Sequence, residues 1–152
     1  MLAVVRPDAW NFPLFLHVGG AMALVASLVM ALYAIRIART RGDQPAAQFA
    51  FRVLWRFTLP AFIVMRTGAE WIASKEHLEN SNDAWVGIGF TVADGGLLLL
   101  IVGLILTGLM ARRSKRGASV AGATPLTAAA GLSGVLIVAY IVAIWAMTTK
   151  PT

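Results

Sequence analysis

Residues 126–147 read LTAAAGLSGVLIVAYIVAIWAM and contain no charged side chain. At a helical rise of about 1.5 Å per residue, this stretch is long enough to cross the roughly 30 Å hydrocarbon core of a bilayer. Pro125 precedes it and suits the first turn of a helix, and Pro151 lies beyond its end. The stretch therefore predicts a transmembrane helix.

Three further apolar runs precede this stretch, and they cover residues 12–35, 53–73 and 85–111. The run 53–73 has the lowest hydropathy, because it carries Arg56, Arg66 and Glu70. We still expect it to be a span, since the connections between the runs are too short for a soluble domain and favour antiparallel neighbours. The prediction is an all-α, up-down-up-down four-helix transmembrane bundle, a single domain over residues 1–152.

The composition supports this class. Hydrophobic residues make up 59% of the 152 residues and charged residues only 13%, which is too few to cover a soluble domain. The absence of cysteine excludes disulfides and thiolate metal sites. The net charge of +6 comes from short clusters beside the apolar runs, so we expect contacts with anionic inner-leaflet lipids and no nucleic acid.

Basic residues near the helix ends predict the orientation. Two of the predicted connections and their flanks hold nine of the 13 Lys and Arg residues, five in the first and four in the third: Arg36, Arg39, Arg41, Arg52, Arg56, Arg112, Arg113, Lys115 and Arg116. These two connections, residues 36–52 and 112–124, are expected in the cytoplasm. Both termini and the acidic connection 74–82 are then outside a bacterial plasma membrane.

Small residues recur at four-residue spacing in two of the runs, as Gly19, Ala23 and Ser27 and as Ala130 and Gly134. Such spacing lets helix backbones approach closely in lipid. Packing within one chain and association into a homo-oligomer or a membrane protein complex both explain it, and we favour packing within the chain.

Four ionisable residues lie within the predicted spans, at positions that should be surrounded by lipid: His17, Arg66, Glu70 and Asp94. A charge at mid-membrane costs roughly 2.5–3.5 kcal/mol on insertion scales, so each charged group needs a partner. Counting about 1.5 Å per residue from the outer helix ends places His17 and Glu70 in one layer, and Arg66 and Asp94 in a deeper one. We predict an Arg66–Asp94 ion pair, with Glu70 shared between Arg66 and His17.

Two hydroxyl side chains lie beside this cluster. Thr67 lies on the polar face of the predicted span that carries Arg66, and Thr91 lies about one helical turn before Asp94. The cluster is either a clasp that fixes helix register or a site open to the outside. As a site it would offer a basic centre for an anionic or polar ligand, or a proton-carrying pair of histidine and carboxylate.

Histidine also raises two cofactor hypotheses. His17 could ligate one haem near the outer side, together with His77 or a methionine, although two histidines are too few for a pair of haems. In the outer connection, His77, Glu79 and Asp83 are candidate ligands of a divalent cation, but we favour a solvated polar turn that caps the next helix. No phosphate-binding glycine loop, zincin motif or nucleophile elbow is present, so no motif indicates an enzyme.

The motif LHVGG at residues 16–20, the two basic inner connections and the ending WAMTTKP at residues 145–151 resemble a bacterial family of small four-span membrane proteins of unknown function. The plan is also similar to the copper-resistance D and membrane protoporphyrinogen-oxidase families. Those two families share an early histidine, so the resemblance implies a haem or metal contact for His17. The chain lacks the further intramembrane histidines of those families.

The sequence thus predicts a membrane protein that acts by binding, as an accessory subunit or as a small-ligand binder that uses the outer-half cluster. Two other classes stay open. One is a haem- or quinone-associated redox protein, and the other is a small proton-coupled transporter.

Overall fold

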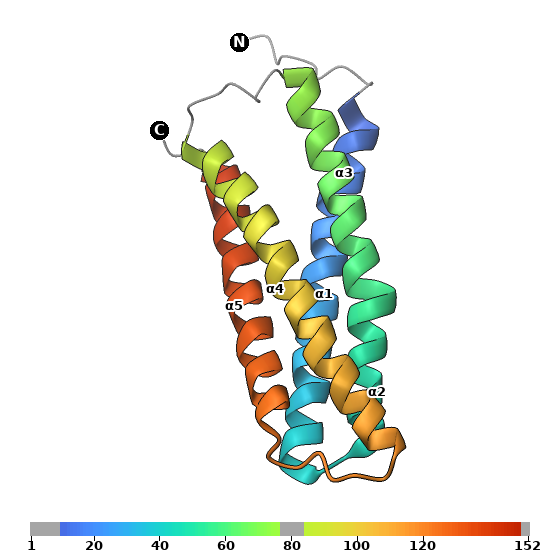
Figure 1. Ribbon diagram of the computed structural model, residues 1–152. Helices are drawn as coiled ribbons and strands as arrows, with labels where there is room; N and C mark the ends of the chain where they lie inside the picture. The colour runs from blue at the N-terminus through green and yellow to red at the C-terminus, as the bar shows by residue number, and fades with distance from the viewer. Residues whose placement is uncertain (1–9, 77–83, 150–152) are drawn as a thin grey trace.

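The computed structural model describes residues 10–76 and 84–149, and these are helical apart from short connections. Because α2, the π-helical turn η2 and α3 follow one another without a break, the helices form four rods (Figure 1). The elements are α1 (Asn11–Arg41), α2 (Gln44–Val53), η2 (Leu54–Thr58), α3 (Leu59–Glu76), α4 (Ala84–Lys115) and α5 (Thr124–Thr149). The all-helical prediction is confirmed.

Three of the rods, α1, α4 and α5, are long and apolar enough to cross a membrane. Their large apolar side chains are exposed as well as buried, as on α5 at Val138, Ile141 and Trp145. A helix that is apolar on every side is typical of a span, since its outer faces contact lipid. The rod of α2, η2 and α3 carries more charge, and its crossing of the membrane stays a prediction.

The predicted connection 36–52 is wrong, because helix covers almost all of it. Gly42 ends α1 with a φ of 68°, which a residue without Cβ adopts readily. Asp43 then caps α2, as its carboxylate accepts a hydrogen bond from the Ala46 amide at 2.9 Å. Pro45 lies in the first turn of α2, where a backbone amide has no hydrogen-bond partner within the helix. Its missing amide hydrogen therefore costs the helix no hydrogen bond.

The connection predicted at residues 112–124 is also shorter in the structure than expected, because α4 continues to Lys115. The amide of Gly122 donates to the carbonyl of Arg39 at 3.0 Å, which ties this connection to the end of α1. Val120 is fully buried between the helix ends. An apolar run in the sequence marks only the part of a helix that spans the hydrocarbon. These helices extend beyond that part into basic and small residues.

The π-helical turn η2 ends at Thr58, two residues before Pro60. Proline has no amide hydrogen, and its ring clashes with the carbonyl four residues earlier, so the α-helical ladder cannot continue unchanged. The Leu59 amide bonds the carbonyl of Leu54, and the hydroxyl of Thr58 donates to the carbonyl of Val53 at 3.4 Å. The wider turn therefore provides donors for the carbonyls of the buried residues Val53 and Leu54.

Helices α1 and α3 approach so closely that glycine is needed on both sides. A Cβ on Gly20 of α1 would lie 2.6 Å from the Met65 amide nitrogen of α3, and one on Gly68 would lie 2.6 Å from the His17 amide nitrogen. The predicted contact through Gly19 and Ala23 is wrong, because both are exposed and nothing lies within 4 Å of a Cβ on Gly19. The packing face is rotated by one residue.

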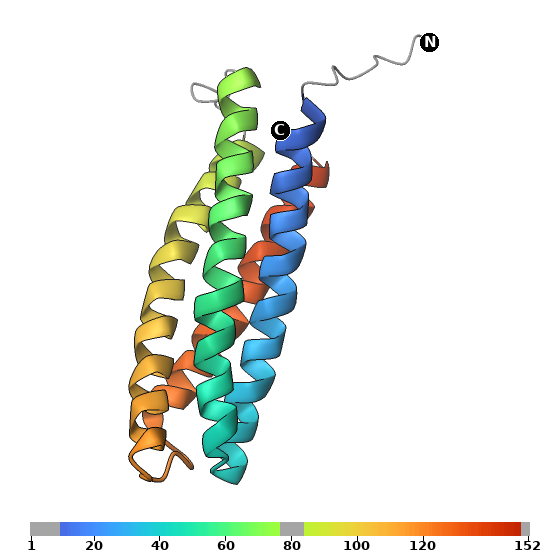
Figure 2. The same cartoon turned by 90° about the vertical axis from the view of Figure 1, so that its right-hand side faces the viewer.

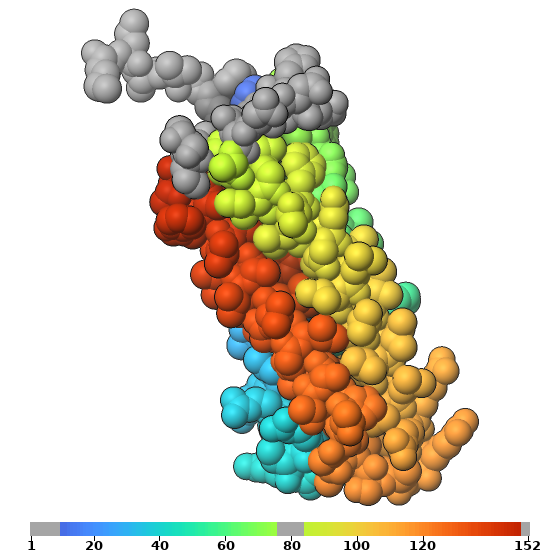
Figure 3. Space-filling view, turned by 60° about the vertical axis from the view of Figure 1, so that its left-hand side comes forward, coloured from blue at the N-terminus to red at the C-terminus, as the bar shows by residue number. Residues whose placement is uncertain are grey.

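The rods form two pairs, α1 with α3 and α4 with α5 (Figure 1). Figure 2 shows α1 and α3 side by side, with α5 crossing behind α3. The pairs are in contact through α1 with α5 and through α2 with α4. They separate towards the end where α3 finishes and α4 begins, so α3 touches α4 over only a short stretch (Figure 1). Figure 3 shows α4 and α5 together forming one continuous face of the molecule.

Candidate functional site

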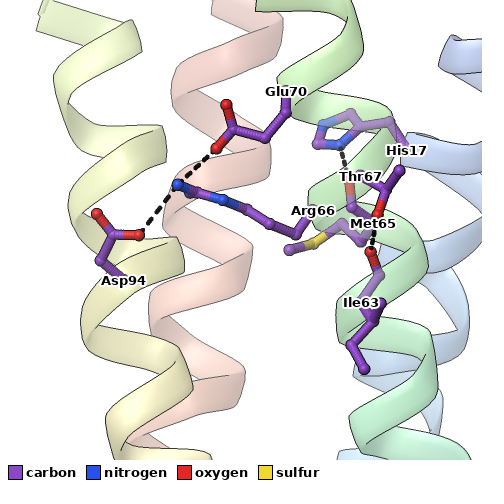
Figure 4. Close-up of polar contacts among 7 residues, drawn as sticks. All are labelled: His17, Ile63, Met65, Arg66, Thr67, Glu70 and Asp94. Atoms are coloured by element: carbon purple, nitrogen blue, oxygen red, sulfur yellow. Dashed lines mark hydrogen bonds and ion pairs between the residues drawn. The ribbon is translucent and has the colours of Figure 1, made fainter.

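An ion cluster of Arg66, Glu70 and Asp94 bridges α3 and α4 (Figure 4). The Arg66 guanidinium lies 2.6 Å from the Glu70 carboxylate, one turn further along α3, and 3.1 Å from the Asp94 carboxylate on α4. The predicted Arg66–Asp94 ion pair is confirmed. The side chain of Arg66 is 26% exposed, whereas those of Glu70 and Asp94 are 49% and 71% exposed.

The Phe90 ring of α4 adds a contact to this cluster. Its centroid lies 5.1 Å from the Arg66 guanidinium carbon, within the range of a cation–π interaction. Arg66 is therefore held by two carboxylates and an aromatic face. One cation against two carboxylates gives the cluster a formal charge of −1. Its role as a basic centre for a ligand stays a prediction.

His17 does not pair with Glu70, and that prediction is wrong. Its Nδ1 lies 3.1 Å from the carbonyl oxygen of Met65, and no ion pair joins it to Glu70 within residues 10–76 and 84–149 (Figure 4). Met65 and Arg66 are adjacent on α3, so their side chains point about 100° apart. The close approach at Gly68 holds His17 against the Met65 side, whereas Glu70 shares the face of Arg66 that is turned towards α4.

The hydrogen bond of His17 also determines its tautomer. A carbonyl oxygen only accepts, so Nδ1 must carry the hydrogen. In the neutral ring, Nε2 is then a free acceptor or metal ligand, and a histidine ligand is commonly oriented by such a carbonyl.

The two threonines do not join the ion cluster. Thr67 is exposed and donates to the carbonyl of Ile63 in its own helix at 2.9 Å (Figure 4). Thr91 is exposed on α4 and has no hydrogen bond to the cluster within the part of the chain that the structure describes. The predicted cation ligands His77, Glu79 and Asp83 lie outside the described residues. Among the residues described, no group of three His, Cys, Asp or Glu side chains could hold a metal ion.

A cavity of about 360 Å³ lies behind the cluster, between the two separating helix pairs. Arg66 and His17 are among its lining residues, together with Tyr140 of α5. Most of the remaining wall is apolar and comes from all four rods, for example Leu14, Ile72, Val86, Phe90 and Met147. The volume is within the range of sites for small organic molecules.

Tyr140 is the residue of this site that sequence reasoning missed. Its side chain is 5% exposed, and its hydroxyl is the buried side-chain polar atom, among the residues described, that has no hydrogen-bond partner. It packs against Gly96 of α4, where a Cβ would lie only 2.5 Å from the hydroxyl oxygen. The available signal was a tyrosine within a charge-free span, since a hydroxyl in lipid requires a partner.

No protein-family model, curated protein or solved structure matches the chain. The resemblance to the family of small four-span membrane proteins therefore stays a prediction. Function must be inferred from the cavity and the side chains around it.

Proposed function

We propose that the chain is a multi-pass protein of the bacterial cytoplasmic membrane, a four-helix bundle of up-down topology with both termini outside. Three apolar rods support the membrane location. The rod of α2, η2 and α3 packs along α1, so it would cross the bilayer with its partner. Its charged residues Arg66 and Glu70 are paired with each other, which lowers the cost of placing them there.

The clustering of basic residues supports the orientation. The ends of α1 and α4 and the start of α2 lie together at one end of the molecule (Figure 1), and this end carries Arg39, Arg41, Arg112 and Lys115. The chain has no cysteine, so single cysteines can report topology. In intact cells, an impermeant maleimide should label Ser74→Cys and leave Ser119→Cys unlabelled. The reverse pattern would refute the orientation.

The cavity lined by His17, Arg66 and Tyr140 would face the outside in this orientation, and it is called the outer cavity below. For the activity, we propose that the outer cavity binds an uncharged, largely apolar molecule that carries a carbonyl oxygen. The observation that carries this proposal is Tyr140, which lines an apolar cavity and whose buried hydroxyl has no hydrogen-bond partner among the described residues. An unpaired buried hydroxyl costs about 1–3 kcal/mol, and an acceptor atom of a ligand would recover this. Arg66 lines the cavity, but its charge is already matched by Glu70 and Asp94, which disfavours an anion as the ligand.

The cluster then has a structural part in the same site. Arg66 lines the cavity and links α3 to α4 through Asp94. A clasp at this position limits how far the two helix pairs separate, and so holds the cavity at a fixed width. The expected proton-carrying pair lacks its contact, because His17 faces Met65 instead of Glu70.

The test compares two ligands of similar shape, menadione and 2-methylnaphthalene, of which only menadione has carbonyl oxygens. Binding to the purified protein is followed by tryptophan fluorescence, since Trp85 lines the cavity. Menadione should bind more tightly than 2-methylnaphthalene, and Tyr140→Phe should reduce this preference about fivefold, which is the value of one hydrogen bond of about 1 kcal/mol. Tyr33→Phe is the control, because Tyr33 is 68% exposed. Equal binding of both ligands, or an unchanged preference in Tyr140→Phe, would contradict the proposal.

A haem protein is the second candidate, and the donor atoms around the cavity favour it. His17 has its Nδ1 against a carbonyl and its Nε2 available, and the methionines Met65 and Met147 line the same cavity. His17 and one of these methionines would hold the haem, which would supply one-electron chemistry. A spectrum of protein expressed with ample haem, oxidised and then dithionite-reduced, decides this. A Soret band that is lost in His17→Ala would establish haem, and protein absorbance alone would exclude it.

A further inference from the structure

A second cavity lies at the basic end of the molecule, between the α2–η2 segment and α4. We propose that this basic groove binds the phosphate-bearing headgroup of an anionic phospholipid from the inner leaflet. Its volume is about 660 Å³, and it shares no lining residue with the outer cavity. Two features of the groove support the proposal. It is positively charged, and it has a cationic part and an apolar part.

Four cationic side chains line the groove. Arg52 and Arg56 come from the α2–η2 segment, and Arg112 and Lys115 come from the last turns of α4. No acidic residue lines it, and none of the four makes an ion pair within residues 10–76 and 84–149. All four are exposed. Like charges on facing walls repel each other, so a bound phosphate would remove the repulsion and accept charge-assisted hydrogen bonds from both walls.

The two walls are held together by polar contacts between helices. Ser114 is buried on α4. Its hydroxyl donates to the backbone carbonyl of Gln44 at 3.1 Å and accepts from the side-chain amide of Gln48 at 3.2 Å. The Phe51 ring packs over Gly108, where a Cβ would lie 3.1 Å from it. These contacts fix the spacing between the two helices before any ligand arrives, so binding requires no rearrangement of the helices.

The groove becomes apolar away from the end of α4. Trp55, Leu104, Ile105 and Leu109 line this part, and the α4 residues from Leu104 to Lys115 extend over roughly 16 Å. A free phosphate would leave these apolar side chains without a use. A phospholipid matches both parts, since its phosphate meets the cations and its acyl chain lies along the apolar wall.

This inference rests on the proposed membrane location and orientation, but not on the proposed ligand of the outer cavity. Menadione binding in the outer cavity gives an independent readout. A variant that loses lipid and retains menadione binding has lost the groove only.

The test is native mass spectrometry of the full chain with phosphatidylglycerol and with phosphatidylcholine of the same acyl chains. The wild type should bind phosphatidylglycerol at least about tenfold more tightly. The groove variant Arg112→Gln/Lys115→Gln should lose about 30-fold in that affinity, because two basic contacts to an anionic headgroup contribute about 1 kcal/mol each. The control Arg113→Gln/Arg116→Gln removes the same charge from the same end, at exposed residues that do not line the groove, and should lose less than about twofold.

The opposite wall provides a second variant, Arg52→Gln/Arg56→Gln, which should reproduce the loss if the first variant fails to fold. Equal losses in the groove and control variants would indicate diffuse attraction to charge and overturn the proposal. Equal affinity for the two lipids would overturn it as well. Millimolar inorganic phosphate should leave the lipid bound, because phosphate makes no apolar contact, and complete displacement would assign the groove to free phosphate.

Discussion

The neighbouring glycines Gly19 and Gly20 give a matched pair of substitutions for testing the contact between α1 and α3. A Cβ on Gly20 would lie 2.6 Å from the amide nitrogen and 2.8 Å from the Cα of Met65, whereas a Cβ on Gly19 meets nothing within 4 Å. Replacing glycine by alanine within a helix gains up to about 1 kcal/mol in propensity, and both variants gain it equally. The difference between Gly20→Ala and Gly19→Ala therefore isolates the steric cost of the contact.

Overpacking in a well-packed core costs about 1–3 kcal/mol. We expect the upper part of that range, about 2–3 kcal/mol, because the atoms opposite Gly20 are mostly backbone and cannot rotate away. At about 2–4 °C per kcal/mol for a chain of this length, Gly20→Ala should melt about 4–12 °C below Gly19→Ala. Thermal unfolding of both variants in the same detergent, followed by helical circular dichroism, measures this difference. Equal melting temperatures would refute the close approach of α1 and α3.

Two further predictions concern polar contacts between helices. In a double-mutant cycle, Arg66→Gln and Asp94→Asn should each lower the melting temperature and couple by about 0.5–1.5 kcal/mol, and additive effects would argue against the clasp. Arg66→Gln should cost more, because it leaves the Glu70 and Asp94 carboxylates without their shared cation. Ser114→Ala should cost about 1–3 kcal/mol, because it removes the partner of two polar groups from α2. Ser27→Ala is its control, since that buried hydroxyl donates only to a carbonyl of its own helix, and an equal loss in melting temperature would contradict the role of Ser114.

The helices and the cross-helix ion pair were predictable because they depend on local properties. A charge-free run such as residues 126–147 forms a helix through its own hydrogen bonds, whatever its neighbours are. The pairing of Arg66 with Asp94 followed from the fixed rise per residue, which places both at one depth when α3 and α4 run in opposite directions. Depth along a helix axis is therefore readable from the sequence.

The rotation of each helix about its axis was decided only by the tertiary structure. In a soluble protein the polar face of a helix reveals that rotation, but α1, α4 and α5 are apolar on all sides, so no such signal exists. The contact of Gly20 instead of Gly19, the bond of His17 to Met65 instead of Glu70, and the burial of Tyr140 all depend on it. The outer cavity and the basic groove depend also on how the helix pairs separate, and this is set by packing between segments far apart in the chain.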